Sequence, residues 1–376
     1  MNTLCYLLSG LTSDHYIIKI NYNIQGNKMI KKTIVLAGLI LALFSGSTYA
    51  KKHKIVLIHG FQPQQLLNDG DVTANGQDYW SGYWDNLADA RIDWPSYERV
   101  EEKISTDYVW PKLKSFSQSN FCSPGCIFVT HSTGDLVARY IIENQETWLE
   151  NAGLTPLNIV ATFDIAGAGG GSELADLAVS VAQATENWTF LIEAALEAWL
   201  GGDLTDEMGV LHDLKVNNAR QLAPFPDARI PRLRFIGDAT EYLGVTSPFI
   251  QGNDDGVVGT HSSCGGNRQG HYGSCSSAVS ISGKLNYQSN AVAGFMPYHY
   301  PMLMSDAYSH GSLLEQEQQG KVTTASSVEQ FQSGESIVFD TYQQTKGWWF
   351  WKSDYLYVKN SKNDSLSALI YSAIPN

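Results

Sequence analysis

One stretch decides the fold of this 376-residue chain: Cys126-Ile127-Phe128-Val129-Thr130-His131-Ser132-Thr133-Gly134-Asp135-Leu136-Val137-Ala138-Arg139-Tyr140-Ile141-Ile142. Strand-forming residues lead into Ser132, and apolar residues then recur at the spacing of one helix face. The order of strand, sharp turn and helix raises the serine hydroxyl above the edge of a sheet. The backbone N–H of Thr133, at the start of the helix, then points toward any oxyanion formed on that serine. This stretch therefore indicates a nucleophilic serine.

Two neighbours of Ser132 modify the pattern. Thr130 stands where the serine turn usually has glycine, and it reduces the room where strand and helix cross. His131 directly precedes the serine, and a side chain at that position points away from the nucleophile. We therefore expect His131 to pack in the interior and not to act as the base.

The composition describes a globular, acidic protein. The chain is 43% hydrophobic and only 17% charged, so it is able to bury a large core in one α/β domain with a small addition. Its net charge is −13, and without residues 1–50, which hold four lysines and one acid, it becomes −16. This charge excludes nucleic acid as an expected partner and argues against a strong electrostatic hold on anionic membranes.

Residues 29–50 have the order of a secretory signal peptide: a basic start, an apolar run and a small-residue end at Ala50. We expect cleavage after Ala50 and no stable membrane insertion afterwards, because the apolar run is short for a membrane span. Residues 1–28 then form an upstream extension outside the fold. The mature protein is expected to be secreted or periplasmic.

The cysteines fit an oxidising compartment. Cys5 lies in the discarded segment, which leaves Cys122, Cys126, Cys264 and Cys275. Pairing of neighbours predicts disulfides Cys122–Cys126 and Cys264–Cys275, although four cysteines allow three connectivities. A zinc site is the alternative, but the sequence has no tight His/Cys cluster, so we expect neither a metal nor another cofactor.

Other segments outline an α/β domain over residues 51–320. Lys54 to Ile58 and Leu157 to Ile165 predict buried strands, the first followed by His59-Gly60-Phe61 and the second by a glycine-rich loop expected to pass close to Ser132. The N–H of Phe61 is a candidate second oxyanion donor. Residues 172–222 are apolar and helical, as expected of a lid inserted after a core strand.

Two further segments are rich in aromatic residues, and the sequence leaves two roles open for each. Residues 62–94 look like a loop whose aromatic side chains either line an acyl groove or pack beneath it. Residues 321–376 change in character and predict a small β-rich appendage, with strands around Ser336 and through Trp348 to Val358. Its aromatic residues either bind a surface or sugar, or pack on the main domain.

The combined pattern resembles secreted bacterial triacylglycerol lipases and esterases. The resemblance lies in the His59-Gly60-Phe61 loop, the stretch around Ser132, Gly171-Ser172-Glu173-Leu174-Ala175-Asp176 and Asp255-Gly256-Val257-Val258, in patches over residues 54–315. It implies an α/β-hydrolase fold, a mostly parallel sheet with helices on both faces. It also implies a catalytic order of serine, acid and histidine along the chain.

The resemblance assigns Ser132 as nucleophile, Asp255 as acid, and the N–H groups of Phe61 and Thr133 as the oxyanion hole. Asp238 and Asp254 are rival acids. The sequence departs from the family in its glycine-rich run and in Pro301, where the family has an acid that helps to hold calcium. A calcium site of the family type is therefore not expected.

The base is the open question. His261 follows Asp255 closely and His271 lies between two cysteines expected to pair, which leaves His299 and His310. We favour His299, because it lies on an expected loop between two apolar segments and its spacing resembles that of the lipase histidine. His310, before an expected helix start, is the alternative.

These residues predict a serine carboxylic-ester hydrolase that acts on acyl-ester or lipid substrates through an acyl-enzyme. An acyltransferase or thioesterase would use the same residues. A catalytically silent hydrolase domain used for binding is the alternative from a different class.

Overall fold

The computed structural model describes most of the chain from residue 53 onward. The described residues are 53–68, 70–81, 83–183, 189–202, 208–222, 230, 232–265, 269, 299–303, 308–315, 326–330, 336–358 and 366–373. The expected upstream extension, 1–28, and the expected signal peptide, 29–50, lie outside them, as do His271 and Cys275. All described residues belong to one compact unit, Ala50–Asn376.

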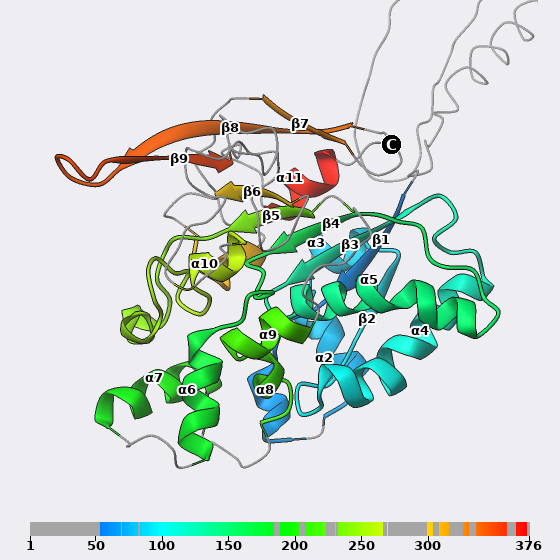
Figure 1. Ribbon diagram of the computed structural model, residues 1–376, viewed down its shortest axis with the longest axis horizontal. Coiled ribbons are helices and arrows are strands. Elements are labelled where there is room, and N and C mark those ends of the chain that lie inside the picture. The colour runs from blue at the N-terminus through cyan, green and yellow to red at the C-terminus, as the bar shows by residue number, and fades with distance from the viewer. Residues whose placement is uncertain are drawn as a thin grey trace, which may run out of the picture. The chain divides into compact units, whose positions relative to one another are not determined.

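A parallel sheet forms the centre of this unit (Figure 1). Its strands lie in the order β2 (Ala90–Ile92), β1 (Lys54–Ile58), β3 (Cys126–His131), β4 (Ile159–Ile165), β5 (Arg232–Ile236) and β6 (His299–Leu303). Every neighbouring pair in this series is parallel. Parallel neighbours need crossover connections, and helices supply them, which buries both faces of the sheet.

The C-terminal strands extend the same sheet. β9 (Ser353–Val358) pairs in parallel with β6 through Tyr357 and Leu303, and β8 (Ser336–Lys346) and β7 (Ser326–Gln330) continue antiparallel. The β-rich character expected for residues 321–376 is present. The described strands of this segment join the main sheet and belong to its compact unit.

Helices occupy the intervals between the strands. The α-helices are α2 (Val72–Tyr79), α3 (Tyr83–Leu87), α4 (Trp110–Gln118), α5 (Gly134–Asn151), α6 (Glu173–Ala182), α7 (Phe190–Leu200), α8 (Leu211–Leu214), α9 (Val216–Leu222), α10 (Thr260–Ser263) and α11 (Leu366–Ala373). A π-helical segment, η2 (Val100–Val109), precedes α4, and short 3-10 turns are η1 (Pro63–Leu66), η3 (Tyr242–Gly244), η4 (Ser247–Phe249) and η6 (Ser312–Leu314).

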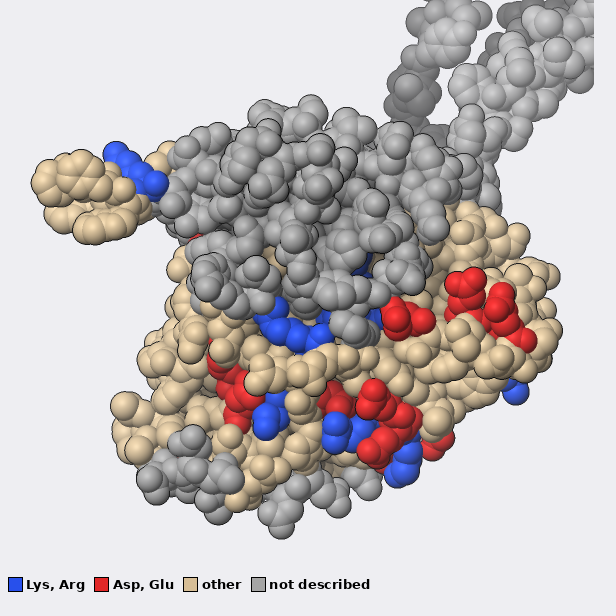
Figure 2. Space-filling view, viewed as in Figure 1, with Lys and Arg blue, Asp and Glu red and all other residues tan. Residues whose placement is uncertain are grey.

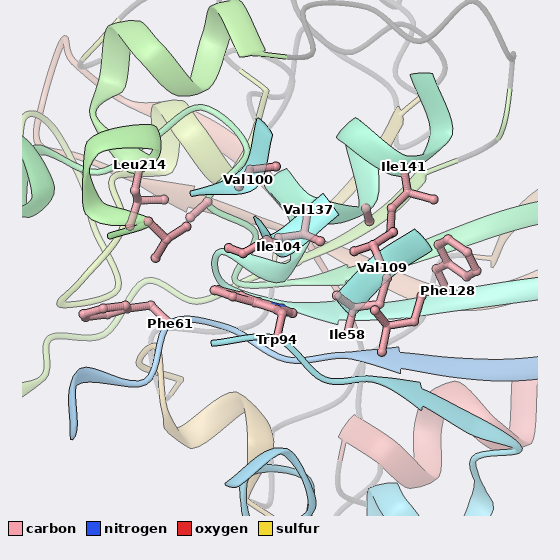
Figure 3. Close-up of a cluster of buried hydrophobic side chains, with 14 of the residues drawn as sticks. Ile58, Phe61, Trp94, Val100, Ile104, Val109, Phe128, Val137, Ile141 and Leu214 are labelled. Carbon is pink, nitrogen blue, oxygen red and sulfur yellow. The ribbon is translucent and has the colours of Figure 1, made fainter. Parts of the chain in front are cut away.

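Alternate residues of each central strand belong to two separate cores, because successive strand side chains point to opposite faces. Val56, Ile58 and Phe128 pack with α5 and η2 side chains on one face, part of which Figure 3 shows. Ile55, Leu57 and Ile127 pack on the other face with Trp80, Trp84 and residues of α11. Both faces are covered, so the expected α/β fold, a mostly parallel sheet with helices on both faces, is confirmed.

The segment from residue 62 to 94 differs from its expectation. It contains η1, α2 and α3 and not one long loop. The N-cap of α2 is Asp71, whose side chain accepts hydrogen bonds from Thr73 N and Ala74 N. Trp80 and Trp84 are fully buried in the second core. These two rings therefore pack beneath the surface and do not line a groove.

Candidate active site

Ser132 lies at a strained turn between β3 and α5. Its φ is 53°, a left-handed value that is uncommon for a residue other than glycine and that recurs where strain serves a site. Its N–H donates to Ile165 O at 3.0 Å, so the turn is tied to the end of the next strand. A Cβ at Gly134 would lie 2.6 Å from His59 O, so only glycine lets α5 approach β1 this closely. The predicted strand, turn and helix around Ser132 are confirmed.

Thr130 has a structural role at the position where the motif usually has glycine. Its side chain is fully buried, and Oγ1 donates to Asp164 Oδ1 at 2.8 Å. Asp164 also accepts from Thr162 Oγ1 at 3.1 Å and from Arg232 Nε at 3.1 Å. The threonine therefore supplies a donor to a buried carboxylate directly beneath the turn.

A buried group of charges supports the helix that follows Ser132. Asp135, on the first turn of α5, forms ion pairs with Arg232 and Arg234 of β5, and all three side chains are almost fully buried. Burial acts to raise the pKa of Asp135, but Arg234, Arg232 and Arg139 outweigh it and hold that pKa below its usual range. Asp135 is therefore charged at neutral pH and links the serine turn to β5.

The glycine-rich loop after β4 wraps around this turn, as the sequence predicted. Ala168 N donates to Ser132 O at 2.9 Å, and Gly169 N donates to Asp135 Oδ2 at 2.9 Å. A Cβ at Gly167 would lie 2.6 Å from Asp135 Oδ2, so the loop needs glycine to come this close.

Asp255 and His310 form the acid and histidine pair of the site. His310 Nδ1 donates to Asp255 Oδ2 at 2.9 Å, and both side chains are buried. The other oxygen, Oδ1, accepts from Val257 N at 3.1 Å and Val258 N at 2.7 Å, which fixes the carboxylate. Gly256 has a φ of +97°, a conformation that favours glycine, so the tight turn after Asp255 explains the glycine of the Asp-Gly-Val-Val sequence.

His299, the preferred base, does not lie beside Asp255, whereas His310, the alternative base, is bonded to that acid. His299 begins β6 and pairs with Arg232 at the start of β5, which places it at the level of Phe128 and not at the carboxyl end of β3, where Ser132 lies. The sequence reasoning assumed a loop there. The choice between two distant histidines depends on tertiary contacts, and no local pattern around His299 or His310 encodes those.

The remaining acids and histidines have other partners. Asp238 Oδ1 accepts from Asn253 Nδ2 at 3.3 Å, and Asp254 Oδ1 accepts from Ser247 Oγ and Gly256 N, both at 2.8 Å. His261 Nε2 donates to Glu173 Oε1 at 2.9 Å, which joins α10 to α6.

The surroundings of His310 make it a stronger base than a free histidine. Burial acts to lower the pKa of its imidazole, but the charge of Asp255, the hydrogen bond to Asp255 and the charge of Glu241 outweigh it and raise that pKa. Glu241 Oε1 also accepts from Gly311 N at 2.8 Å and Ser309 Oγ at 3.1 Å, so it holds the backbone on both sides of His310. The sequence offered no signal for Glu241.

His131 connects the serine turn to the His310 loop. Its Nε2 lies 3.1 Å from the carbonyl oxygen of His310, which only accepts, so Nε2 carries the proton. Burial, followed by the neighbouring His310, lowers the pKa of His131 well below its usual value, so the ring is neutral and Nδ1 is an acceptor. The Tyr79 hydroxyl fills that acceptor position by donating to Nδ1.

Tyr79 in turn packs against the loop after β1: a Cβ at Gly60 would lie 2.5 Å from the Tyr79 hydroxyl oxygen, and the Tyr79 ring lies 5.5 Å from that of His59. Three chain segments therefore meet through one Tyr79–His131 pair: the Gly60 loop, the residue before Ser132 and the backbone of His310. His131 was expected only to pack, and Tyr79 had no distinguishing sequence pattern.

The His59-Gly60-Phe61 loop is held rigidly beside the serine. A Cβ at Gly60 would lie 2.7 Å from Ser132 Cβ, so this glycine permits the close approach. His59 is buried, its Nε2 accepts from Trp94 N at 3.0 Å, and its Nδ1 donates to Gly60 O at 2.8 Å. Burial lowers the pKa of His59 to about 4, so this hydrogen-bonding pattern persists at neutral pH.

The cysteines and the possible ion sites complete the description. Cys122 and Cys126 form the predicted disulfide, and Cys264 is also disulfide-bonded. Within the described residues, no group of three or more His, Cys, Asp or Glu side chains is arranged to hold a metal ion. A search of those same residues also finds no helix with the length and apolar character needed to cross a membrane.

Solved bacterial lipases have similar structures. The mature form of a Bacillus licheniformis lipase is matched with a TM-score of 0.38 and 16% identity, over 69% of this chain and 86% of that one. Staphylococcus hyicus lipase gives 0.40 and 13%, over 71% and 90%, and lipase 1 from Pelosinus fermentans gives 0.39 and 15%, over 70% and 93%. No protein-family model and no curated protein matches this chain. The functional proposal below therefore rests on the geometry of the site.

Proposed function

We propose that the protein is a serine carboxylic-ester hydrolase in which Ser132, His310 and Asp255 form the catalytic triad. The observation that carries the proposal is the His310–Asp255 hydrogen bond of 2.9 Å on a loop whose backbone is bonded to the residue before Ser132. Because His310 donates through Nδ1, its Nε2 is the nitrogen that takes the proton of Ser132.

The reaction follows from these roles. As Nε2 of His310 removes its proton, Ser132 Oγ attacks the ester carbonyl, and the N–H groups of Phe61 and Thr133 stabilise the tetrahedral oxyanion. The histidine then protonates the leaving alcohol, and the acyl group stays on Ser132. A water molecule, deprotonated by the same nitrogen, attacks the acyl-enzyme and releases the acid. Asp255 stabilises the imidazolium that forms in both steps.

We propose that α6 to α9, within residues 172–222, form a lid over an apolar acyl site. The ring of Trp199 on α7 packs against Phe61, with centroids 5.5 Å apart, so α7 touches the residue that carries the first oxyanion donor. At the start of the same helix, Phe190 and Leu191 are 80% and 67% exposed. These contacts favour esters with apolar acyl chains as substrates.

We also propose export from the cytoplasm. The disulfide Cys122–Cys126 is the kind of bond that persists in oxidising compartments, and residues 29–50 have the order of a cleaved signal. The mass of the exported protein, determined intact, should correspond to a chain that starts near Lys51.

A fluorophosphonate probe and a panel of p-nitrophenyl esters test the catalytic proposal. The parent protein should react with the probe at Ser132 and hydrolyse some members of the panel, while Ser132→Ala should lose both, with kcat reduced by about 10⁴-fold or more. Ser119→Ala, an exposed serine after α4, is the matched control and should behave as the parent. Labelling of the parent at any residue other than Ser132 would contradict the assignment.

A further inference from the structure

The turn between β8 and β9 exposes four consecutive aromatic side chains, here called the aromatic tip: Trp348, Trp349, Phe350 and Trp351. Their exposed fractions are 85%, 72%, 78% and 82%. By contrast, Trp80, Trp84 and Trp94 are buried to within 2%. Figure 2 shows the aromatic tip as a tan knob with blue lysine atoms at the left edge of the view. The sequence predicted strand through this segment, but the structure forms a turn there.

The backbone of the aromatic tip is arranged to hold these rings outward. Trp349 has a φ of +53°, which is costly for a bulky residue and usually marks a functional constraint. Gly347 has a φ of +108°, and a Cβ there would clash with the carbonyl oxygen of Trp351. Trp351 N donates to Trp348 O at 3.1 Å, and the rings of Trp349 and Phe350 lie 4.5 Å apart. The display of the rings is therefore a property of a defined turn.

The sequence at the aromatic tip is basic. Residues 345–353 contain Lys346 and Lys352 and no acidic residue, with Asp340 and Asp354 further along the two arms of the hairpin, in a chain whose net charge is −13. Lys352 is exposed directly beside Trp351. A cationic surface next to aromatic rings attracts a partner that is both apolar and anionic.

We propose that the aromatic tip docks onto the surface of a phospholipid bilayer. Trp is the aromatic residue best suited to the lipid–water boundary, because its ring is apolar and its N–H hydrogen-bonds to water or headgroups. The exposed Lys352 then lies at the level of the phosphate groups. Docking of four rings places the protein on the bilayer without a spanning segment, in the manner of peripheral proteins.

Two other occupants fit the aromatic tip less well. A sugar would need hydrogen-bonding acceptors beside the rings, but residues 347–352 contain only aromatic residues, one glycine and one lysine. A stable protein–protein interface uses about 20–30 residues on each side, far more than this turn offers. Both occupants are included as outcomes of the experiment.

Docking goes beyond the proposed ester hydrolysis and does not depend on it, so we test it on the inactive full-length mature protein carrying Ser132→Ala. Binding is measured by sedimentation with phosphatidylcholine vesicles, with and without anionic phosphatidylglycerol. The parent should bind, and its Trp fluorescence should shift to shorter wavelength on binding. Replacing Trp348 and Trp351 by Ala should weaken binding by at least about tenfold, because two large rings then stay in water.

Two matched variants separate the aromatic tip from other surfaces. Phe190→Ala with Leu191→Ala removes an exposed apolar pair on α7, in the proposed lid, and should weaken vesicle binding less than the Trp348/Trp351 variant does. Lys352→Gln should weaken binding by about fivefold to vesicles with phosphatidylglycerol and hardly at all to those without it. Binding that is lost in the Phe190/Leu191 variant but kept in the Trp348/Trp351 variant would overturn the proposal.

Further outcomes distinguish the proposals from one another. A parent protein that does not bind either vesicle, but forms dimers that Trp348→Ala and Trp351→Ala dissociate in sedimentation, would assign the aromatic tip to a second copy. Binding to soluble oligosaccharides and not to vesicles would assign the aromatic tip to sugar binding. Either result overturns lipid docking.

In the protein that retains Ser132, the Trp348/Trp351 variant should hydrolyse soluble p-nitrophenyl esters normally and vesicle-borne esters more slowly. Vesicle binding by a parent that hydrolyses no ester would refute only the proposed function.

Discussion

His310 is bonded to Asp255 twice: its Nδ1 donates to Oδ2 at 2.9 Å, and its backbone N–H donates to the Asp255 carbonyl oxygen at 2.8 Å. The side-chain bond orients the imidazole, and the backbone bond fixes the loop that carries it. Both depend on two segments that lie 55 residues apart in the chain.

The first prediction concerns the identity of the base. His310→Asn should reduce kcat by about 10⁴-fold, as expected when a triad member is lost, with the fold retained. His299→Asn is the matched control and should keep most of the activity, because His299 starts β6 away from Asp255. Steady-state kinetics with a soluble ester measures both, and equal losses in the two variants would contradict the assignment.

The second prediction concerns pH. His310 must be neutral to act as base. An ordinary histidine has a pKa near 6.5. Because the pKa of His310 is raised, its imidazole stays protonated up to a higher pH. kcat/KM should therefore fall as the pH drops through a value above 6.5. Glu241→Gln removes one of the charges that raise this pKa, while its side-chain oxygen still accepts from Gly311 N.

The acidic limb of the pH profile should consequently move to lower pH in Glu241→Gln, with the plateau rate changed little. Glu98→Gln, on a carboxylate paired with Lys103, is a control for the loss of a negative charge elsewhere. A limb that stays in place in the Glu241 variant would show that this carboxylate does not act on His310.

The third prediction concerns the Tyr79–His131 pair. Tyr79→Phe removes the donor to His131 Nδ1 and should lower stability by about 1–3 kcal/mol, since a buried acceptor loses its partner. It should also lower kcat by about tenfold or more, with little change in KM, because the His310 loop and the Gly60 loop lose a shared support. Tyr140→Phe, whose ring packs on Trp148, is the control and should leave kcat unchanged.

Denaturant unfolding and steady-state kinetics distinguish positioning from a purely structural role. If Tyr79→Phe loses stability but keeps kcat, the pair supports the fold and does not position the site.

The fourth prediction concerns the disulfide between α4 and β3. Cys122→Ser with Cys126→Ser should lower the free energy of unfolding by about 2 kcal/mol, the amount expected for so short a loop. kcat should stay the same, because the disulfide is at the start of β3 and Ser132 follows its other end. An unchanged denaturation midpoint would mean that the bridge does not constrain the unfolded chain.

Sequence reasoning predicted local structure where the relevant residues are neighbours in the chain. The strand, turn and helix around Ser132 were predicted correctly, and Asp255 was selected through the resemblance of its Asp-Gly-Val-Val context. The role of Thr130 was not predictable, because its partner Asp164 lies on the next strand. The His310–Asp255 bond was not anticipated for the same reason, since only the folded chain brings these two residues together.

The helices of residues 62–94 were missed for a different reason. They are short, and their sequence is rich in residues that favour turns, so local propensity argues against them. Burial of Trp80 and Trp84 in the second core outweighs that preference. The C-terminal strands were predicted. Their continuity with the main sheet depends on pairing between β9 and β6, which no local sequence pattern predicts.

Helix α11 has a consequence for how the protein is made. Ile370 and Tyr371 close the core around Trp84, and the Tyr371 hydroxyl donates to Trp84 O across 287 positions of the chain. Because a chain emerges from its N-terminus first, one face of the sheet stays open until α11 has been synthesised. Packing around Trp84 is therefore completed only after every described strand of the sheet has been made.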